Sequence, residues 1–184
     1  MKTAPRGLHN EGVEGLLKGH IGSIPDFPIP GILFKDITPL LANGEAFATA
    51  VDSMTASVED IDFDAILAVE ARGFLFGAPI ASRLRRGLIL VRKPSKLPAT
   101  IDSFDYTCEY CEGTLEVRAG QVRAGRRYLV LDDILATGGT ARATADYVSR
   151  CRGTLVGYCF LIELAFLRGR DLLSDAPVRS VVVY

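Results

Sequence analysis

The sequence predicts an α/β protein built on a mostly parallel sheet. Short apolar runs, which suit strands buried on both faces, alternate with segments whose apolar residues recur at helical spacing. The expected strands are 65–69, 88–91, 128–131, 155–162 and 178–184, and the expected helices are 45–57, 76–85 and 141–148. Because crossover connections join parallel strands, this alternation favours a central sheet flanked by helices.

The N-terminal part of the chain is expected to begin with a helical or irregular lead-in of about twenty residues. Three prolines and a glycine at positions 25 to 31 then force an extended, turning path, because proline restricts the backbone and lacks an N–H donor. A turn at 43–44 precedes the first expected helix. Further along, a long polar loop is expected from about 92 to 113, with a strand and turn at 115–122.

Composition and length narrow the class of protein. A chain of 184 residues suits a single domain over residues 1–184. The net charge of -1 gives no general basic surface, so nucleic acid is not an expected partner. The first twenty residues lack the apolar core of a signal peptide, and no apolar run is long enough to span a bilayer. A cytoplasmic protein with no membrane partner is therefore expected.

Polar turns follow three of the expected strands, at 70–73, 92–96 and 132–140. In parallel α/β sheets, ligands bind beyond the carboxyl ends of the strands. These turns are therefore expected to converge on one ligand.

The third turn has the composition of a phosphate-binding turn. Its glycines allow a tight backbone curl, its threonines offer hydroxyl donors, and the following helix offers unsatisfied N–H groups. The turn comprises Ala136, Thr137, Gly138, Gly139 and Thr140. It lacks the lysine and spacing of a P-loop and the G-x-G-x-x-G of a dinucleotide fold, so a monophosphate is the expected ligand.

Two successive carboxylates, Asp132 and Asp133, come directly before this turn. Such a pair repels itself unless it accepts hydrogen bonds from vicinal hydroxyls or helps to hold a magnesium complex. A phosphate site beside a diol site indicates ribose 5-phosphate.

An apolar strand, two acidic residues, two apolar residues and A-T-G-G-T together resemble the signature of the type I phosphoribosyltransferases. The resemblance implies that Asp132 and Asp133 bind the ribose hydroxyls of phosphoribosyl pyrophosphate (PRPP), and that residues 136–140 bind its 5-phosphate. It implies Mg²⁺ as cofactor, held through the substrate or by the acidic pair. It also implies the type I fold, with a small N-terminal hood within 1–38, a flexible catalytic loop over 92–113, and a homodimer.

Other segments resemble the adenine phosphoribosyltransferases in particular. They are residues 25–31, 34–39, 70–77, 91–98 and 161–164, together with Gly169 and Arg170. The resemblance runs from about Ile21 to the C-terminus. It implies that Leu33, Phe34, Lys35 and Leu164 line the adenine. Phe34 would stack on the base, and backbone groups of Leu33 would read its Watson–Crick edge.

Basic residues at two strand ends suit the pyrophosphate of PRPP. The expected pyrophosphate residues are Ala71, Arg72, Arg92, Lys93 and Lys96. The resemblance also implies that the long loop closes over the site, that Tyr110 belongs to it, and that Glu109 assists proton movement at the purine. Arg72 and Glu109 are the expected catalytic residues.

The implied reaction converts adenine and PRPP into AMP and pyrophosphate, a step of purine salvage. An inverting displacement through an oxocarbenium-like transition state is expected, with magnesium and basic groups stabilising the departing pyrophosphate. One alternative is an enzyme for another purine, hypoxanthine or xanthine, against which the segments around Phe34 and Glu109 argue. The other is a noncatalytic PRPP-binding regulator, for whose nucleic-acid-binding domain the chain has no room.

The chain departs from the family pattern at three positions. Cys108 and Cys111 flank the Glu109–Tyr110 pair where an apolar residue and a glycine are common, and Lys35 stands where arginine is common. The two cysteines lack the second pair or nearby histidines of a zinc site. Free thiols are favoured, and a loop disulfide formed on oxidation is the alternative.

Overall fold

A computed structural model describes residues 6–27, 30, 33–98, 100–108 and 111–184. The chain divides into two compact units, residues 1–53 and 54–184. Each unit has its own arrangement of secondary structure, and the expectation of a single domain over 1–184 stays a prediction. None of the helices within the described ranges is long and apolar enough to cross a membrane.

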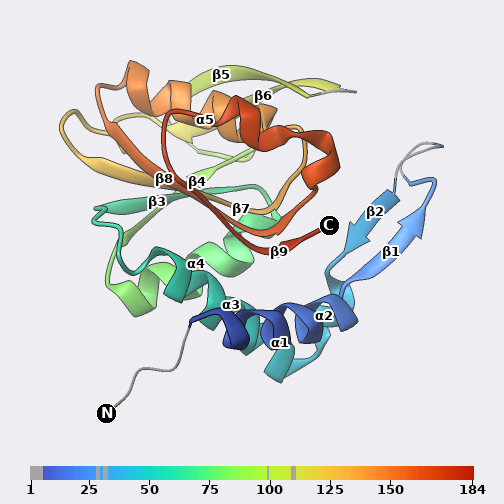
Figure 1. The fold of residues 1–184 in the computed structure, drawn as a ribbon. Coiled ribbons are helices and arrows are strands. Elements are labelled where there is room, and N and C mark those ends of the chain that lie inside the picture. Colours follow the sequence, from blue (N-terminus) through green and yellow to red (C-terminus); the bar gives the residue numbers. More distant parts are fainter. Residues whose placement is uncertain (1–5, 28–29, 31–32, 99, 109–110) are drawn as a thin grey trace, which may run out of the picture. The chain divides into compact units, whose positions relative to one another are not determined.

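The first unit contains helices and a short antiparallel ribbon (Figure 1). Its elements are α1 (Arg6–Gly19), β1 (Gly22–Pro25), β2 (Leu33–Asp36), α2 (Thr38–Ala42) and the start of α3 (Gly44–Val58). Strands β1 and β2 pair in register from Gly22 opposite Asp36 to Pro25 opposite Leu33. The expected helical lead-in and the extended, turning path after it are therefore confirmed where the structure describes them.

The second unit is built on a five-stranded sheet with the order β4-β3-β7-β8-β9, in which every neighbouring pair is parallel. Its strands are β3 (Ala65–Val69), β4 (Gly87–Val91), β7 (Arg127–Leu135), β8 (Thr154–Glu163) and β9 (Val178–Val183). Two helices, α4 (Arg72–Leu84) and α5 (Gly139–Arg150), lie on opposite faces of this sheet (Figure 1). The predicted α/β class with a central parallel sheet is confirmed.

The core of this unit explains why the apolar runs form strands. All five residues of β3 are buried, as expected for a strand covered on both faces. On one face, Ala141, Ala145 and Val148 of α5 pack in a cluster with alternate residues of β3 and β7. These three are the residues whose spacing predicts the helix, so the helical stripe and the strand period meet in one core.

Two of the element boundaries that differ from the sequence prediction bear on the site. Helix α4 begins at Arg72 rather than near Phe76, which makes the arginine part of its first turn. Strand β7 continues past Leu131 to Leu135, so Asp132 and Asp133 lie within the strand. The reason is the neighbouring strand, because β8 extends the ladder to the pairing of Leu135 with Glu163.

The expectation of one polar loop over 92–113 is wrong in its secondary structure. The segment contains β5 (Ile101–Cys108) and the start of β6 (Cys111–Arg118), which pair as an antiparallel ribbon from Ile101 opposite Arg118. A tertiary contact accounts for the ribbon, because the buried ring of Phe104 stacks on Tyr147 of α5. The flexibility of the segment stays a prediction.

Short 3-10 turns complete the second unit between β8 and β9. They are η1 (Ala165–Leu167) and η2 (Gly169–Leu172), separated by Arg168 in the left-handed backbone region. This connection brings Gly169 against the turn that follows β7.

Candidate active site

The turn after β7 has the geometry of an anion-binding turn. Gly138 precedes the first residue of α5 with a φ of 84°, a left-handed conformation that favours glycine. The N-terminal N–H groups of the twelve-residue helix α5 follow directly. Residues 134–141, with Asp132 and Phe160, line a cavity of about 150 Å³ at this point. All five residues of the predicted phosphate turn thus face one small cavity.

Asp133 is the most deeply buried carboxylate of the site, at 2 % exposed. Its Oδ2 lies 2.9 Å from Nε of Arg72, so the first turn of α4 brings a guanidinium to the acidic pair. That oxygen nevertheless accepts no hydrogen bond of acceptable geometry from the residues that the structure describes. A buried oxygen left without a donor suits a ligand that brings a hydroxyl or a cation.

The two adjacent carboxyl groups share a water-poor environment. Burial raises the pKa of Asp132 well above its ordinary value, and repulsion by Asp133 adds to the rise. Burial also raises the pKa of Asp133, although the Arg72 guanidinium opposes the shift. The Asp133 N–H donates to Oδ1 of Asp132 at 2.8 Å. Bringing both charges together costs folding energy, which is typical of a site that is arranged for a ligand.

Gly73 carries the turn after β3 against the acidic pair. A Cβ at this position would lie 3.0 Å from both Asp132 Oδ1 and the carbonyl oxygen of Leu131. Only a residue without a side chain allows this approach, so the glycine sets the separation between α4 and β7. The predicted convergence of this turn with the turn after β7 is therefore confirmed.

Glu70 joins the turns after β3 and β4. Its Oε2 accepts a hydrogen bond from the Lys93 backbone N–H at 2.6 Å and another from Arg92 Nε at 3.1 Å. Although partial burial opposes ionisation, these two donors hold the pKa of Glu70 below its ordinary value. The peptide bond between Glu70 and Ala71 is cis.

Glu70 is a functional candidate that the sequence reasoning missed. An acidic residue at a strand end next to a basic cluster is a signal that would have found it. Of the predicted pyrophosphate residues, Arg92 and Lys93 are brought together through Glu70, whereas Arg72 contacts the acidic pair through Asp133. The Lys93 and Lys96 side chains are exposed.

The predicted adenine residues of the first unit lie on β2. The Leu33 side chain is 45 % exposed, and the half-buried Phe34 ring contacts Phe27 edge to face at 5.2 Å. Lys35 is buried, its Nζ donates to Ser23 Oγ at 3.0 Å, and its pKa is lowered by burial and by Lys18. A buried ammonium that donates across the ribbon supports β2 itself.

The structure describes Leu164 but not the two predicted loop residues. Leu164 is 6 % exposed, and its N–H donates to the Leu135 carbonyl at 2.9 Å, so it belongs to the core of the second unit. Its place in one base pocket with the β2 residues stays a prediction. The predicted catalytic Glu109 and its neighbour Tyr110 lie outside the described residues.

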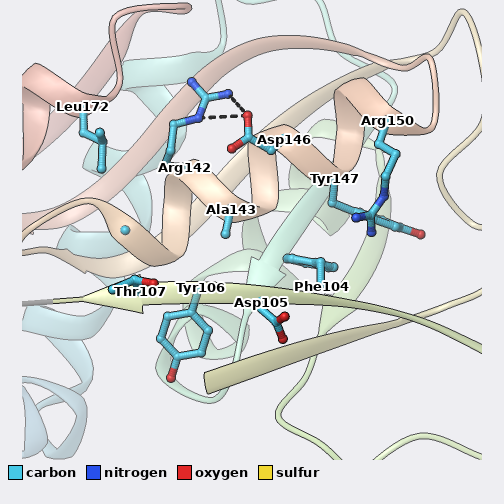
Figure 2. Close-up of a pocket in the computed structure, with 11 residues that line it drawn as sticks. Phe104, Asp105, Tyr106, Thr107, Arg142, Ala143, Asp146, Tyr147, Arg150 and Leu172 are labelled. Carbon is cyan, nitrogen blue, oxygen red and sulfur yellow. Dashed lines mark hydrogen bonds and ion pairs between the residues drawn. The ribbon is translucent and has the colours of Figure 1, made fainter. Parts of the chain in front are cut away.

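A larger cavity of about 400 Å³ lies between the ribbon and α5, and Figure 2 shows its lining. Of the predicted site residues, only Gly139 contributes to it. The Phe104 and Tyr147 rings stack at 4.7 Å, and the Tyr147 hydroxyl donates to Asp102 Oδ2 at 2.8 Å. Burial raises the pKa of Tyr147, so this hydroxyl stays protonated. These contacts dock the ribbon on α5.

The chain is similar to known phosphoribosyltransferases. The family model described as phosphoribosyl transferase domain matches residues 40–181. Adenine phosphoribosyltransferase 2 of Rhizobium etli is 51% identical over 175 residues, covering 95% of this chain and 92% of the relative. Adenine phosphoribosyltransferase of Pseudothermotoga lettingae is 48% identical over 168 residues, covering 91% of this chain and 99% of the relative.

Solved structures lead to the same group. The crystal structure of adenine phosphoribosyltransferase from Thermoanaerobacter pseudethanolicus has a TM-score of 0.89 and 45% identity, covering 94% of this chain and 99% of that one. The Saccharomyces cerevisiae enzyme, solved in complex with an imino-altritol bisphosphate and adenine, has a TM-score of 0.84 and 35% identity, covering 94% and 99%.

Proposed function

Since the chain belongs to the phosphoribosyltransferase family, and within it to the adenine phosphoribosyltransferases, we propose which of its residues carry the reaction. The enzyme converts adenine and PRPP into AMP and pyrophosphate, a purine salvage reaction. This assignment leaves no support for the two alternatives, an enzyme for hypoxanthine or xanthine and a noncatalytic regulator. The contact of Arg72 with Asp133 beside the phosphate turn is the main support for the proposed site.

The 5-phosphate binds in the cavity of about 150 Å³ at the start of α5. Backbone N–H groups of Gly138, Gly139 and Thr140 donate to its oxygens, and the hydroxyls of Thr137 and Thr140 add further donors. The conformation of Gly138 supports this role, because its φ of 84° curls the backbone at the helix start.

The acidic pair binds the ribose. Asp133 Oδ2, which is buried without a hydrogen bond from the described residues, accepts a hydrogen bond from one ribose hydroxyl, and Asp132 accepts one from the adjacent hydroxyl. Arg72 balances the charge of Asp133.

Magnesium fits this donor set as a cation held mainly by the substrate. Within the described ranges, no three His, Cys, Asp or Glu residues form a metal-binding cluster, so PRPP itself has to supply most of the ligands. Asp132 and Asp133 are the protein groups that would support it, directly or through ribose hydroxyls. When bound, the ion supplies positive charge that neutralises the departing pyrophosphate.

The pyrophosphate leaves on the side of the turns after β3 and β4. Ala71 contributes a backbone N–H, and the basic groups of Arg72, Lys93 and Lys96 stabilise the negative charge that develops. Arg92 is hydrogen-bonded to Glu70, and this bond supports a role for both residues in shaping the turn rather than in donating freely to substrate.

Adenine binds against Phe34, with the backbone of Leu33 reading its Watson–Crick edge. A backbone donor and acceptor distinguish the 6-amino group of adenine from the 6-oxo group of guanine and hypoxanthine. Lys35 contributes through its position in β2, because its ammonium is hydrogen-bonded to Ser23.

The function is tested by a panel of bases with PRPP and magnesium, monitored by pyrophosphate release. Adenine is expected to be turned over at least about a hundredfold faster than hypoxanthine, guanine or xanthine, because a mispaired edge leaves buried polar groups unmatched. Chelation of magnesium by EDTA is expected to abolish turnover. Turnover of hypoxanthine in preference to adenine would contradict the base assignment, and full activity in EDTA would contradict the magnesium role.

Glu109 assists proton movement at the purine ring. Glu109→Gln is expected to lower kcat by about 10²-fold with little change in the KM for PRPP, since a general acid–base group contributes mainly in the transition state. The matched control is Glu112→Gln, an exposed carboxylate on β6. Equal kcat values for Glu109→Gln and the wild type would remove the role.

The enzyme acts as a homodimer in the cytoplasm. The family resemblance supports the dimer, and the charged substrates PRPP and AMP support the compartment, because phosphate esters do not cross membranes unaided. Sedimentation equilibrium is expected to give twice the chain mass of 19.9 kDa; a monomeric mass would contradict the dimer.

A further inference from the structure

We propose that Arg170 and Glu163 are positioning residues for PRPP, which hold the Gly169 backbone as the support of the phosphate turn. The proposal rests on the proposed binding of the 5-phosphate by residues 136–140. It assigns a role to Gly169 and Arg170, which the reaction itself does not use.

The backbone of Gly169 contacts the phosphate turn directly. A Cβ built on Gly169 would overlap the carbonyl oxygen of Ala136 and lie 2.9 Å from the carbonyl carbon of Thr137. In the other direction, a Cβ on Gly138 would lie 2.6 Å from the carbonyl oxygen of Gly169. The two backbones therefore touch without any side chain between them, and Gly169 forms the floor of the turn.

Arg170 is the next residue, and its side chain is held in place by hydrogen bonds. Its Nε donates to Glu163 Oε1 at 2.9 Å, and its Nη2 donates to Glu163 Oε2 at 2.5 Å, which makes a two-pronged ion pair. Nη1 donates to the Val178 carbonyl at 3.0 Å. Nη2 also donates to Ser180 Oγ at 3.5 Å. The planar guanidinium is thus held at four points, which fix its orientation as well as its distance.

Glu163, the partner of Arg170, is held within the sheet. This carboxylate is 6 % exposed and stands at the end of β8, paired with Leu135 on one side and with Val183 on the other. The Arg170 hydrogen bonds lower the pKa of Glu163, so the ion pair is intact at neutral pH. Arg170 is consequently tied to the sheet itself, on the same edge from which β7 leads into the phosphate turn.

The ion pair between Arg170 and Glu163 limits how far the phosphate turn can move. Because Gly169 precedes Arg170 directly, a shift of the guanidinium moves the floor beneath Ala136 and Gly138. Phosphate-binding N–H groups need a tightly held geometry, and a displacement of about 1 Å is enough to lose much of their binding. Removing the ion pair should therefore weaken binding of the phosphate half of the substrate and leave adenine binding unaffected.

The experiment uses Arg170→Lys and Glu163→Gln, with Arg168→Gln as the matched control. Arg170→Lys keeps the charge and loses the two-pronged geometry, while Glu163→Gln keeps one acceptor in a side chain of the same size. The control residue belongs to the same turn, but its side chain is 81 % exposed and pairs with the exposed Asp171. The measurements are the dissociation constant of ribose 5-phosphate by calorimetry, and kcat and KM for PRPP and for adenine.

Arg170→Lys is expected to raise the dissociation constant of ribose 5-phosphate and the KM for PRPP by about tenfold. Glu163→Gln is expected to raise both by about threefold, since one charged partner remains. In each variant the KM for adenine should stay within about twofold of the wild type, and Arg168→Gln should match the wild type throughout. The double variant should bind no more weakly than Arg170→Lys, because the two changes disrupt one interaction.

The measurements distinguish the positioning role of Arg170 and Glu163 from the proposed binding of the 5-phosphate by residues 136–140. Failure of the wild type to bind ribose 5-phosphate would contradict the assignment of the phosphate turn itself. Binding by the wild type, Arg170→Lys and Glu163→Gln with equal affinity would overturn the positioning role. A merely structural role would lower the thermal midpoint and the concentration of active sites but leave the affinity per site unchanged, and that result would also overturn it.

Discussion

Asp133→Asn is expected to lower kcat/KM for PRPP by about 10²- to 10³-fold, the effect of removing one preorganised polar group from a transition-state site. Asp133 is 2 % exposed, and Arg72 Nε lies 2.9 Å from its Oδ2. An amide at this position cannot balance the guanidinium, and one of its two heavy atoms donates where the ribose hydroxyl needs an acceptor. Steady-state kinetics with varied PRPP and calorimetric titration of PRPP measure the loss.

The same substitution is expected to leave the thermal midpoint unchanged or to raise it. Burial and mutual repulsion raise the pKa of Asp132, so the folded protein holds this pair of charges at a cost that one neutralised member relieves. Asp146→Asn on α5 is the matched control, because that carboxylate is 65 % exposed and pairs with Arg142. Unaltered PRPP affinity in Asp133→Asn would refute the ribose assignment.

Gly138→Ala is expected to lower kcat/KM for PRPP by about 10²-fold, because the phosphate turn has no room for a methyl group. Two effects act together at this position. The φ of 84° is unfavourable for any residue with a side chain, and the added carbon would lie 2.6 Å from the carbonyl oxygen of Gly169. The backbone must move to relieve the overlap, and the N–H groups that face the phosphate move with it.

Gly120→Ala separates the two effects. Gly120 has a similar φ of 77°, but nothing lies within 4 Å of the added carbon. It should lose about 1 kcal/mol of stability from backbone strain and keep full activity. Thermal unfolding and PRPP kinetics on both variants check the comparison. Activity in Gly138→Ala equal to that of Gly120→Ala would show that the contact with Gly169 does not matter for phosphate binding.

Arginine and carboxylate groups are paired at two places in the site. Arg72 balances the buried carboxylate of Asp133, and Glu70 balances Arg92 at the turns after β3 and β4. The exposed Lys93 and Lys96 side chains add positive charge to these turns.

Local patterns in the sequence determined much of this protein. The buried strand β3 and the stripe of Ala141, Ala145 and Val148 follow from periods of apolar residues, which report one-dimensional burial. The phosphate turn follows from adjacent glycines and threonines, because a tight turn draws its conformation from its own residues. Sugar and phosphate chemistry were therefore within reach of the sequence alone.

Only the tertiary structure decided which distant residues meet. The pairing of Arg72 with Asp133 depends on α4 starting at the residue where β3 delivers it beside β7. The ribbon of β5 and β6 depends on Phe104 finding the Tyr147 ring on α5, a contact that no period within 92–113 encodes. Likewise Gly169 lies beneath Ala136 because neighbouring strands bring their ends together. Sequence periods specify which face of an element is buried, whereas strand order and packing select the neighbour that buries it.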